Sequence, residues 1–286
     1  GLDVGTTGTK AVVCDESGCI HGKGYREYEL MFGEHGEVEQ RAQDWYEAAK
    51  GAVREACAAS GVPGSAIEAV SLSTQGGSML AVDRNFAPLT NVMTWMDQRA
   101  AAEADELCAA IGTEELYRAS GWKPGAAYDC AKILWLRRHR PEIFARTASF
   151  VTTLEYMNMR LTGRNVSDPS NAAIRILYHI REGRYDQRIL SFLGISVSQL
   201  PQILPAGCEI GCLTEAAARD LGLHTGVRVY NGAHDQYCAS LGAGAVSVGD
   251  MLVATGTAWV VLGVTDRLIT SDTYVSPGIH PVKGLC

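Results

Sequence analysis

The sequence predicts an α/β or α+β protein in which a helical segment is inserted between two parts of one sheet. Three observations carry this prediction: strand patterns fill the first thirty residues, helical patterns dominate from Gln98 to about Leu200, and strand patterns return at Val227. Elements of both kinds bury their apolar faces by packing in layers. We therefore expect a layered core with the helical segment attached to it.

Three strands joined by tight turns open the chain. They cover Gly1–Val4, Lys10–Cys14 and Cys19–Leu30, with turns at residues 5–8 and 15–18. Because each strand follows the last through a hairpin, antiparallel pairing is expected at this edge of the sheet.

A helix is expected next, from Asp44 as its N-cap to about Ser60, where Gly61 ends it. Strands follow at Ala66–Thr74 and Ser78–Val82. The later elements are a helix at Asp129–His139, a strand at Val227–Gly232, a helix starting over Asp235–Leu241 and a pair of strands within Met251–Val264.

Composition argues against several classes of protein. The net charge of -7 and the lack of any Lys/Arg run disfavour a nucleic-acid partner. The uncharged stretch Met251–Thr265 is too short to cross a bilayer, so no membrane association is expected. Nine cysteines, an odd number without a Cys-x-x-Cys pair, fit reduced thiols in a cytoplasmic protein. Gly1 already lies in a strand, so we expect no signal peptide and a few missing residues, including the initiator Met.

The first hairpin, Gly1–Lys10, has the residue types that surround a phosphate. Its glycines allow close backbone approach, Thr6 and Thr7 offer hydroxyl donors, and Lys10 supplies positive charge. Asp3 at the end of the strand suits a magnesium ion. The alternative is a plain hairpin with Gly and Thr as turn residues.

Two later segments carry matching chemistry. Asp235 stands where a strand meets a helix, and a carboxylate there can accept a hydroxyl proton; the alternative is that it caps the helix. His234 is expected to have a structural role. Thr255–Thr257 is a second Gly-Thr turn that could clamp a triphosphate from the opposite side, or be a buried turn.

In this order, the segments resemble the FGGY family of carbohydrate kinases, within the actin-like ATPase superfamily. The resemblance covers essentially the whole chain. The matching segments are Asp3–Lys10, Trp95–Arg99, Ala131–Leu136, Leu161–Gly163, Ser167–Ala172, Gly232–Gln236 and Ala254–Thr257. The resemblance implies an actin-like (ribonuclease H-like) lobe with a mixed sheet, flanking helices and a helical insertion, followed by the start of a second lobe.

The resemblance also implies the roles of individual residues. Asp235 would be the general base and, with Asp3, would place Mg²⁺. ATP phosphates would be bound by Thr6, Thr7, Lys10, Gly256 and Thr257. The sugar would be contacted by Gln75, Gly76, Gly77, Trp95, Asp97 and Gln236. The implied activity is ATP-dependent phosphorylation of a small sugar, sugar acid or polyol, with a ketose such as xylulose favoured.

The sugar-contact stretch departs from the family. Glycerol kinases place Arg-Glu, and xylulokinases Met-His, where this chain has Gly76 and Gly77. The glycines count against glycerol and leave space or bare backbone. Nearby, Tyr128 or Asp129 could reach the sugar, although a helix-capping Asp129 is the favoured interpretation.

The chain ends soon after the second phosphate turn, before the adenosine motif of the family. We expect residues 1–247 to form the sugar-binding lobe and 248–286 to begin a truncated ATP-binding lobe, leaving the fragment inactive alone. Its exposed apolar surface makes a homodimer a candidate assembly. The alternative function is a non-catalytic sugar-binding or regulatory module of the same superfamily.

Overall fold

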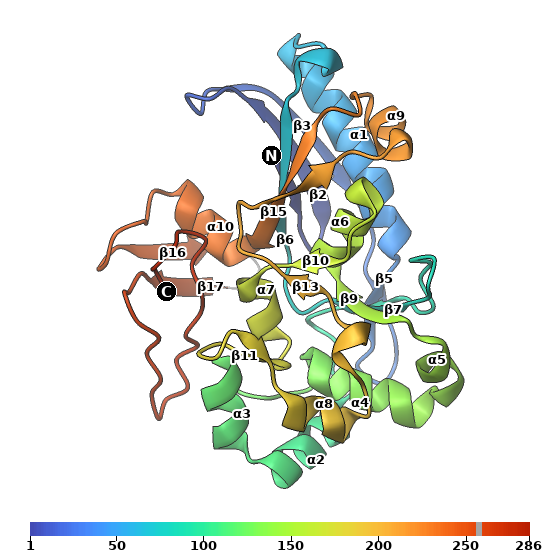
Figure 1. Ribbon diagram of the computed structural model, residues 1–286, viewed down its shortest axis with the longest axis vertical. Helices are drawn as coiled ribbons and strands as arrows, with labels where there is room; N and C mark the ends of the chain where they lie inside the picture. The colour runs from blue at the N-terminus through green and yellow to red at the C-terminus, as the bar shows by residue number, and fades with distance from the viewer. Residues whose placement is uncertain (256–258) are drawn as a thin grey trace.

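The computed structural model describes residues 1–255 and 259–286. Its main sheet and the helix α1 (Ala42–Ser60) form one end of the molecule, and a group of helices forms the other (Figure 1). A two-stranded hairpin and the C-terminal segment lie to one side. This arrangement confirms the expected α/β fold with a mixed sheet and flanking helices.

The main sheet has six strands and is mixed. In spatial order they are β14 (Glu209–Cys212), β15 (Arg228–His234), β6 (Ala69–Thr74), β1 (Leu2–Val4), β2 (Gly8–Cys14) and β3 (Ile20–Glu27). β1, β6 and β15 are mutually parallel, whereas β2, β3 and β14 pair antiparallel with their neighbours. The antiparallel edge predicted for the first three strands is therefore confirmed.

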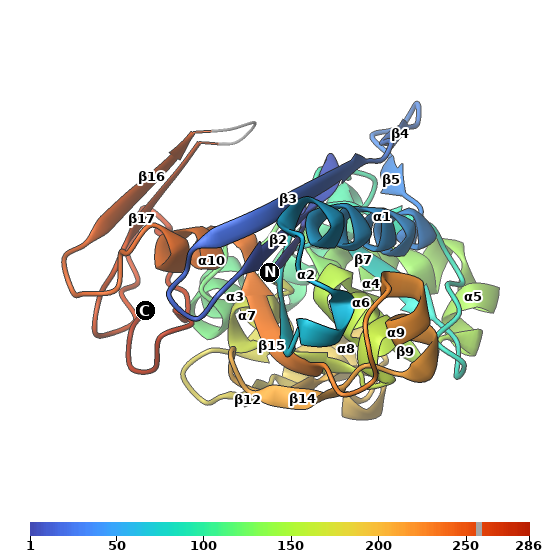
Figure 2. The ribbon, with the colours of Figure 1, turned by 90° about the horizontal axis from the view of Figure 1, so that it is seen from above.

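Helix α1 lies directly on β2 and β3 (Figure 2). Two glycines of β3 allow this close contact: a Cβ at Gly22 would lie 2.1 Å from the carbonyl oxygen of Ala56, and one at Gly24 equally close to that of Ala52. The helix ends at left-handed Gly61, as predicted. The prediction that Asp44 is the N-cap of this helix was wrong.

Helix α1 begins at Ala42, three residues earlier than expected, so Arg41 takes the N-cap position and Asp44 falls in the first turn. A carboxylate there still interacts favourably with the helix dipole. The strand predicted from Ala66 likewise begins at Ala69, because Gly64–Ala66 forms a 3-10 turn.

A second, antiparallel sheet joins the helical segment to the rest of the chain. Its strands, in order, are β4 (Met31–Phe32), β5 (Val38–Gln40), β8 (Val92–Met93), β7 (Met79–Val82) and β9 (Ser149–Thr152). The sequence predicted a largely helical middle, but β9 in that region pairs with β7 along its full length. The insertion is thus anchored by strand pairing as well as by helix packing.

The remaining elements surround these sheets. The helices of the insertion are α2 (Ala101–Ile111), α3 (Thr113–Ser120), α4 (Asp129–His139), α5 (Pro141–Arg146), α6 (Thr153–Thr162), α7 (Pro169–Ile174) and α8 (Gln187–Leu193). Helices α9 (Glu215–Leu221) and α10 (Asp235–Gly242) flank β15 in sequence. Short pairs are formed by β10 (Val166–Ser167) with β13 (Gln202–Ile203) and by β11 (Tyr178–His179) with β12 (Arg184–Tyr185).

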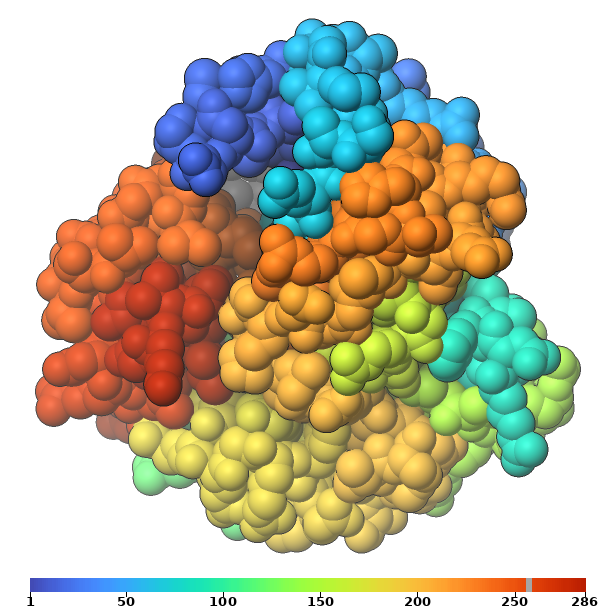
Figure 3. All heavy atoms as spheres, turned by 45° about the horizontal axis from the view of Figure 1, so that its top comes forward, coloured from blue at the N-terminus to red at the C-terminus, as the bar shows by residue number. Residues whose placement is uncertain are grey.

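The C-terminal part consists of the antiparallel strands β16 (Met251–Thr255) and β17 (Trp259–Gly263) followed by an irregular segment. That segment returns to the helical end, where the Tyr117 hydroxyl donates to the carbonyl of Val275 at 2.6 Å. Figure 3 shows these residues gathered on one side of the molecule. The hairpin matches the predicted strand pair.

Two further properties concern the described residues as a whole. None of the helices there is both long and apolar enough to cross a membrane. All nine cysteines are free thiols, in keeping with the expectation of reduced cysteines.

Candidate functional site

The parallel strands β1, β6 and β15 end at the same edge of the main sheet. Val4 is paired with Thr74, which in turn is paired with His234. The residues that immediately follow these strands therefore emerge together, at the carboxyl edge where α/β sheets bind ligands. They are the segments 5–8, 75–77 and 235–236, which the sequence named as phosphate, sugar and catalytic positions.

Asp235 is the first residue of α10, and His234 occupies the N-cap position, so the helix-capping alternative for Asp235 is wrong. Burial, and next the charge of Asp3, raise the pKa of the Asp235 carboxyl, while His234 and Lys10 lower it. The four groups are therefore electrostatic neighbours. Two carboxylates at one edge repel each other, and a divalent cation between them would relieve that repulsion. The side chains present thus fit a magnesium ion.

Asp3 is held in place by its neighbours on both sides. The Ser73 hydroxyl donates to Asp3 Oδ1 at 2.9 Å, and Lys10 Nζ lies 3.7 Å from Asp3 Oδ2. Lys10 is largely exposed, so its ammonium group is available to a further anion. Thr7 at the tip of the turn is also exposed.

Thr6 joins the phosphate turn to the expected sugar residues. Its hydroxyl accepts a hydrogen bond from Trp95 Nε1 at 2.9 Å and donates to Gln75 Oε1 at 3.2 Å. Gln75 Nε2 in turn donates to Gln40 Oε1 at 3.0 Å, and Gln40 Nε2 to the carbonyl of Thr6 at 2.6 Å. This closed network fixes the turn relative to the indole of Trp95.

Two of the expected sugar residues are buried and bonded to protein. Gln75 is held by the network around Thr6. Asp97 is fully buried, accepts the backbone N–H of Val38 at 2.9 Å and forms an ion pair with Arg99 at 2.7 Å. In this structure both side chains orient their neighbours, and their contact with sugar stays a prediction.

The structure favours glycine at positions 76 and 77 for different reasons. Gly77 has φ +69°, a left-handed conformation that favours glycine, and a Cβ there would touch Trp95. At Gly76 a Cβ would lie 2.1 Å from Cδ2 of His234. The sequence suggested that the two glycines leave open space, but at Gly76 the imidazole of His234 fills it.

Polar side-chain contacts fix the position of the end of β15. Its register shifts between Tyr230 and Ala233, a bulge that re-aims the residues before Asp235. Asn231 Nδ2 donates to the carbonyls of Leu204 and Ser167, at 2.8 and 3.0 Å. The strand end is therefore tied to β10 and to the loop that follows β13.

The Asp168–Asn171 segment adds a further tie. Asp168 caps α7 by accepting the backbone N–H groups of Ser170 and Asn171. Ser170 Oγ then accepts the backbone N–H of His234 at 3.0 Å. The polar residues of this segment thus hold the backbone of His234, the residue next to Asp235.

Lys132 on α4 is fully buried among backbone carbonyls. Its Nζ donates to Thr94 at 2.7 Å, Gly77 at 2.8 Å and Met93 at 3.2 Å. Burial lowers the pKa of Lys132 to about 8. This contact holds the Gly77 turn against the segment that carries Trp95.

Asp129 does not reach the site. It is fully buried, and its Oδ2 accepts from Arg175 Nε at 2.5 Å. Tyr128 occupies the N-cap position of α4, so a capping Asp129 is also wrong.

Gly256 and Thr257 of the second phosphate turn lie outside the described residues.

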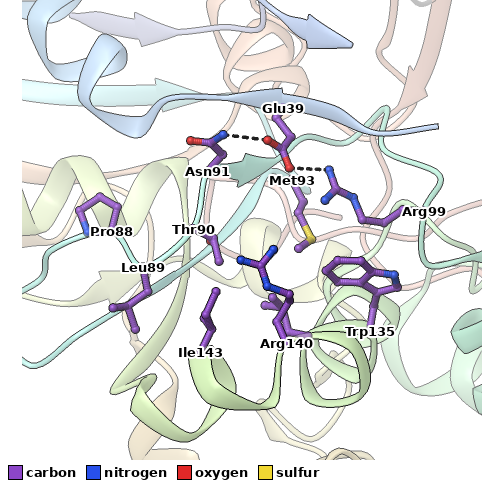
Figure 4. Close-up of a pocket in the computed structure, with 11 residues that line it drawn as sticks. Glu39, Pro88, Leu89, Thr90, Asn91, Met93, Arg99, Trp135, Arg140 and Ile143 are labelled. Atoms are coloured by element: carbon purple, nitrogen blue, oxygen red, sulfur yellow. Dashed lines mark hydrogen bonds and ion pairs between the residues drawn. The ribbon is translucent and has the colours of Figure 1, made fainter. Parts of the chain in front are cut away.

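A hollow of about 430 Å³ is lined by Glu39, Arg99, Trp135 and their neighbours (Figure 4). Arg99 forms its wall, bridging to Glu39 at 2.7 Å and lying over the ring of Trp135. None of the residues expected to bind sugar or phosphate lines it. It is therefore distinct from the site around Asp235.

Comparison with known proteins identifies the family. The sequence profile described as "FGGY family of carbohydrate kinases, N-terminal domain" matches residues 1–242. The chain belongs to the FGGY family of carbohydrate kinases. That match confirms the resemblance seen in the sequence segments.

Its relatives in this family include kinases for different substrates. The chain is 28% identical over 267 residues to the xylulose kinase of Bacillus subtilis (strain 168), covering 93% of this chain and 53% of that protein. It is 33% identical over 226 residues to the glycerol kinase of Trichlorobacter lovleyi, covering 76% and 45%. The chain thus spans about half the length of the curated relatives it matches.

Solved FGGY-family structures share the fold. The xylulose kinase of Rhodospirillum rubrum superposes with a TM-score of 0.93 at 26% identity, over 100% of this chain and 58% of that one. The gluconate kinase of Lactobacillus acidophilus gives 0.90 at 25% identity, over 96% and 55%. These structures confirm the actin-like fold class.

Sequence reasoning placed Lys132 and Ser170 only within segments that match the family, and gave His234 an unspecified structural role, although all three residues shape the site. A lysine within the apolar run of α4 was the signal for a buried polar contact, because a buried ammonium needs oxygen partners. The contact between His234 and Gly76 joins positions 158 residues apart, and no local pattern reveals it.

Proposed function

We propose that the full-length protein transfers the terminal phosphoryl group of ATP to a hydroxyl of a small sugar, sugar acid or polyol. The observation that carries this proposal is the placement of Asp235. Its carboxyl stands at the shared edge of three parallel strands, beside Asp3 and the turn that contains Thr6. Next to it, Gln236 Oε1 is buried and has no hydrogen-bond partner among the described residues. A sugar hydroxyl is the kind of donor that this oxygen lacks.

In the proposed reaction Asp235 accepts the proton of the attacking hydroxyl as its oxygen bonds to the γ-phosphorus of ATP. The bond from that phosphorus to the bridging oxygen breaks, and ADP leaves with the electron pair. Thr6, Thr7 and Lys10 contact the phosphates in this proposal, and the sequence assigns the same role to Gly256 and Thr257. Asp3 and Asp235 would hold a magnesium ion, which would supply positive charge to offset that of the phosphates.

The sugar lies between Trp95, Gly76, Gly77 and Gln236 in this proposal, with Gln75 and Asp97 supporting them. A ketose such as xylulose is the favoured substrate, since the relatives include xylulose kinases. The Arg-Glu pair that glycerol kinases place here is missing, because Gly77 has no side chain and the space beside Gly76 is taken by His234, and this disfavours glycerol.

Residues 1–247 form the sugar-binding lobe in this proposal, and residues 248–286 begin the lobe that holds ATP. The 286-residue chain by itself would then bind sugar and have little kinase activity. The alternative is a non-catalytic sugar-binding module, in which Asp235 would contact sugar without accepting a proton.

Replacing Asp235 by Asn in the full-length protein separates the two functions. The amide cannot accept the proton at this position, so kcat is expected to fall by about 10²–10⁴-fold, while the sugar dissociation constant changes little. A wild-type protein that binds sugar tightly but never produces ADP would instead support the binding module. Coupled detection of ADP, together with calorimetric sugar titration, provides both measurements.

A further inference from the structure

Gly76 has no side chain because His234 occupies the space. Its φ lies outside the left-handed region, so the backbone itself would accept any residue. A Cβ added there would nonetheless lie 2.1 Å from Cδ2 and 2.5 Å from Nε2 of His234. The side chain at this point of the site wall therefore comes from β15 instead of from the loop after β6.

The imidazole of His234 is fixed at several points. Its backbone N–H is held by Ser170 Oγ, its ring packs 5.7 Å from that of Tyr237, and its Nε2 lies 3.5 Å from Asp235 Oδ1. The side chain is only 10% exposed. A ring held in this way can position a ligand group without first losing conformational freedom.

The two ring nitrogens of His234 differ in their surroundings. Nδ1 is buried and has no hydrogen-bond partner among the described residues. Nε2 is the ring nitrogen that lies beside Asp235, so an N–H on this nitrogen faces the site. At 3.5 Å from Asp235, this Nε2–H is too far for a good hydrogen bond and is available to another acceptor.

We propose that His234 is a specificity-determining residue that selects sugars with two adjacent hydroxyl groups. Asp235 takes the proton of one hydroxyl, and Nε2–H of His234 donates to the oxygen of its neighbour. The imidazole also fills the volume of a side chain at position 76, which limits the substituents that fit beside the reacting carbon. This inference rests on the proposed function and adds the chemical pattern that the site recognises: a vicinal diol.

The test compares sugar binding by four forms of the chain: unsubstituted, His234→Ala, His234→Gln and the exposed-site control His35→Ala. Calorimetry measures the affinity for the sugar that binds best and for its analogue lacking the neighbouring hydroxyl. We expect the unsubstituted chain to prefer the diol by about tenfold or more, as one lost hydrogen bond predicts. His234→Ala should remove that preference, whereas His234→Gln, which keeps an N–H donor, should restore part of it.

The possible outcomes distinguish an incorrect role for His234 from an incorrect proposed function. If the unsubstituted chain binds no sugar in a broad panel, the proposed sugar site is itself overturned. If it binds and His234→Ala keeps the full preference for the diol, the sugar site stands and the role of His234 is refuted. A structural role alone would change the melting temperature without changing the ratio between sugar and deoxy analogue.

A second experiment, which needs no sugar, tests whether the imidazole of His234 fills the space beside Gly76. Gly76→Ala should lower the melting temperature, and adding His234→Gly should recover most of the loss because the two changes share one volume. Equal stability of Gly76→Ala and the unsubstituted chain would show that the imidazole does not occupy this space, and would overturn the assignment.

Discussion

Lys132 Nζ lies 2.8 Å from the carbonyl oxygen of Gly77, which joins a helix of the insertion to the glycine turn of the candidate sugar site. The same ammonium group also binds the carbonyls of Met93 and Thr94. The geometry of the site therefore depends on a side chain that does not line it.

Replacing Lys132 by Met should destabilise the fold. The apolar side chain fills the volume but leaves three carbonyls without their donor, so we expect the free energy of unfolding to fall by about 2–4 kcal/mol. Urea unfolding measures the change. The exposed Lys23→Met is the matched control, and an equal effect in both variants would contradict the assigned role.

The buried carboxylate of Asp235, which the proposed reaction needs, should lower the free energy of unfolding. Burial raises its pKa above the ordinary value of 3.8, so the native state binds more protons than the unfolded chain between that value and the raised one. Stability contributed by the protonated form is consequently lost as pH rises through this window.

The Asp235→Asn variant stays neutral and should melt at a higher temperature than the unsubstituted chain at pH 7. The difference should shrink as the pH approaches 4. Thermal scans in metal-free buffer at both pH values would measure it. A variant that melts lower at pH 7 would show that Asp235 gains more from its neighbours than it loses by burial.

The fully buried ion pair of Asp129 and Arg175 should be sensitive to removal of one partner. Arg175→Met leaves the carboxylate of Asp129 without its counter-charge, at an expected cost of about 3–5 kcal/mol. Chemical denaturation tests this, with Arg118→Met in the exposed pair with Glu114 as the control. If the double change Asp129→Leu with Arg175→Met is no more stable than Arg175→Met alone, the stranded charge is not the cause.

The close approach of α1 to β3 predicts a cost for adding one methyl group. Gly24→Ala places a carbon against the carbonyl of Ala52, and separating helix from strand should cost about 1–3 kcal/mol. Gly242→Ala, where nothing lies within 4 Å, is the control. Equal melting temperatures for the two variants would contradict the packing described here.

The hairpin β16–β17 should drive self-association of the chain. Val253 and Val261 are paired across the strands and lie on a face where Trp259 is 78% exposed. Apolar surface of this kind marks an interface. Val253→Lys together with Val261→Glu should therefore shift sedimentation velocity profiles toward the monomer. Ile20→Lys on β3 should leave them unchanged, and persistence of dimers in the double variant would place the interface elsewhere.

Local sequence patterns predicted the first three strands, helix α1 and several later elements, but not the short strands of the insertion or how the elements meet. The helix Asp129–His139 agreed at both ends, because its apolar run and the following Pro141 are local signals. The second sheet was missed, since its strands are short and β7 and β9 are brought together only by the tertiary fold.

The same distinction applies to the site. Asp3, Asp235 and the Gly5–Gly8 turn were named from their motifs, and the parallel strands bring them to one edge of the sheet. The buried state of Gln75 and Asp97 was not predictable, because it depends on partners such as Gln40 and Arg99 in other segments. No property of Gly76 itself reveals that a histidine fills its side-chain space.

The parallel pairing of β6 with β15 has a consequence for the order of folding. The two strands are separated by the entire helical insertion, so β15 can complete the centre of the sheet only after the chain has been synthesised to about His234. Pairings between such distant segments close large loops and slow folding. Until then β6 has an open edge in the nascent chain, and Asp235 is among the last residues of the sheet edge to reach its position. Variants that weaken the insertion should therefore reduce the yield of folded protein even where the finished site is unchanged.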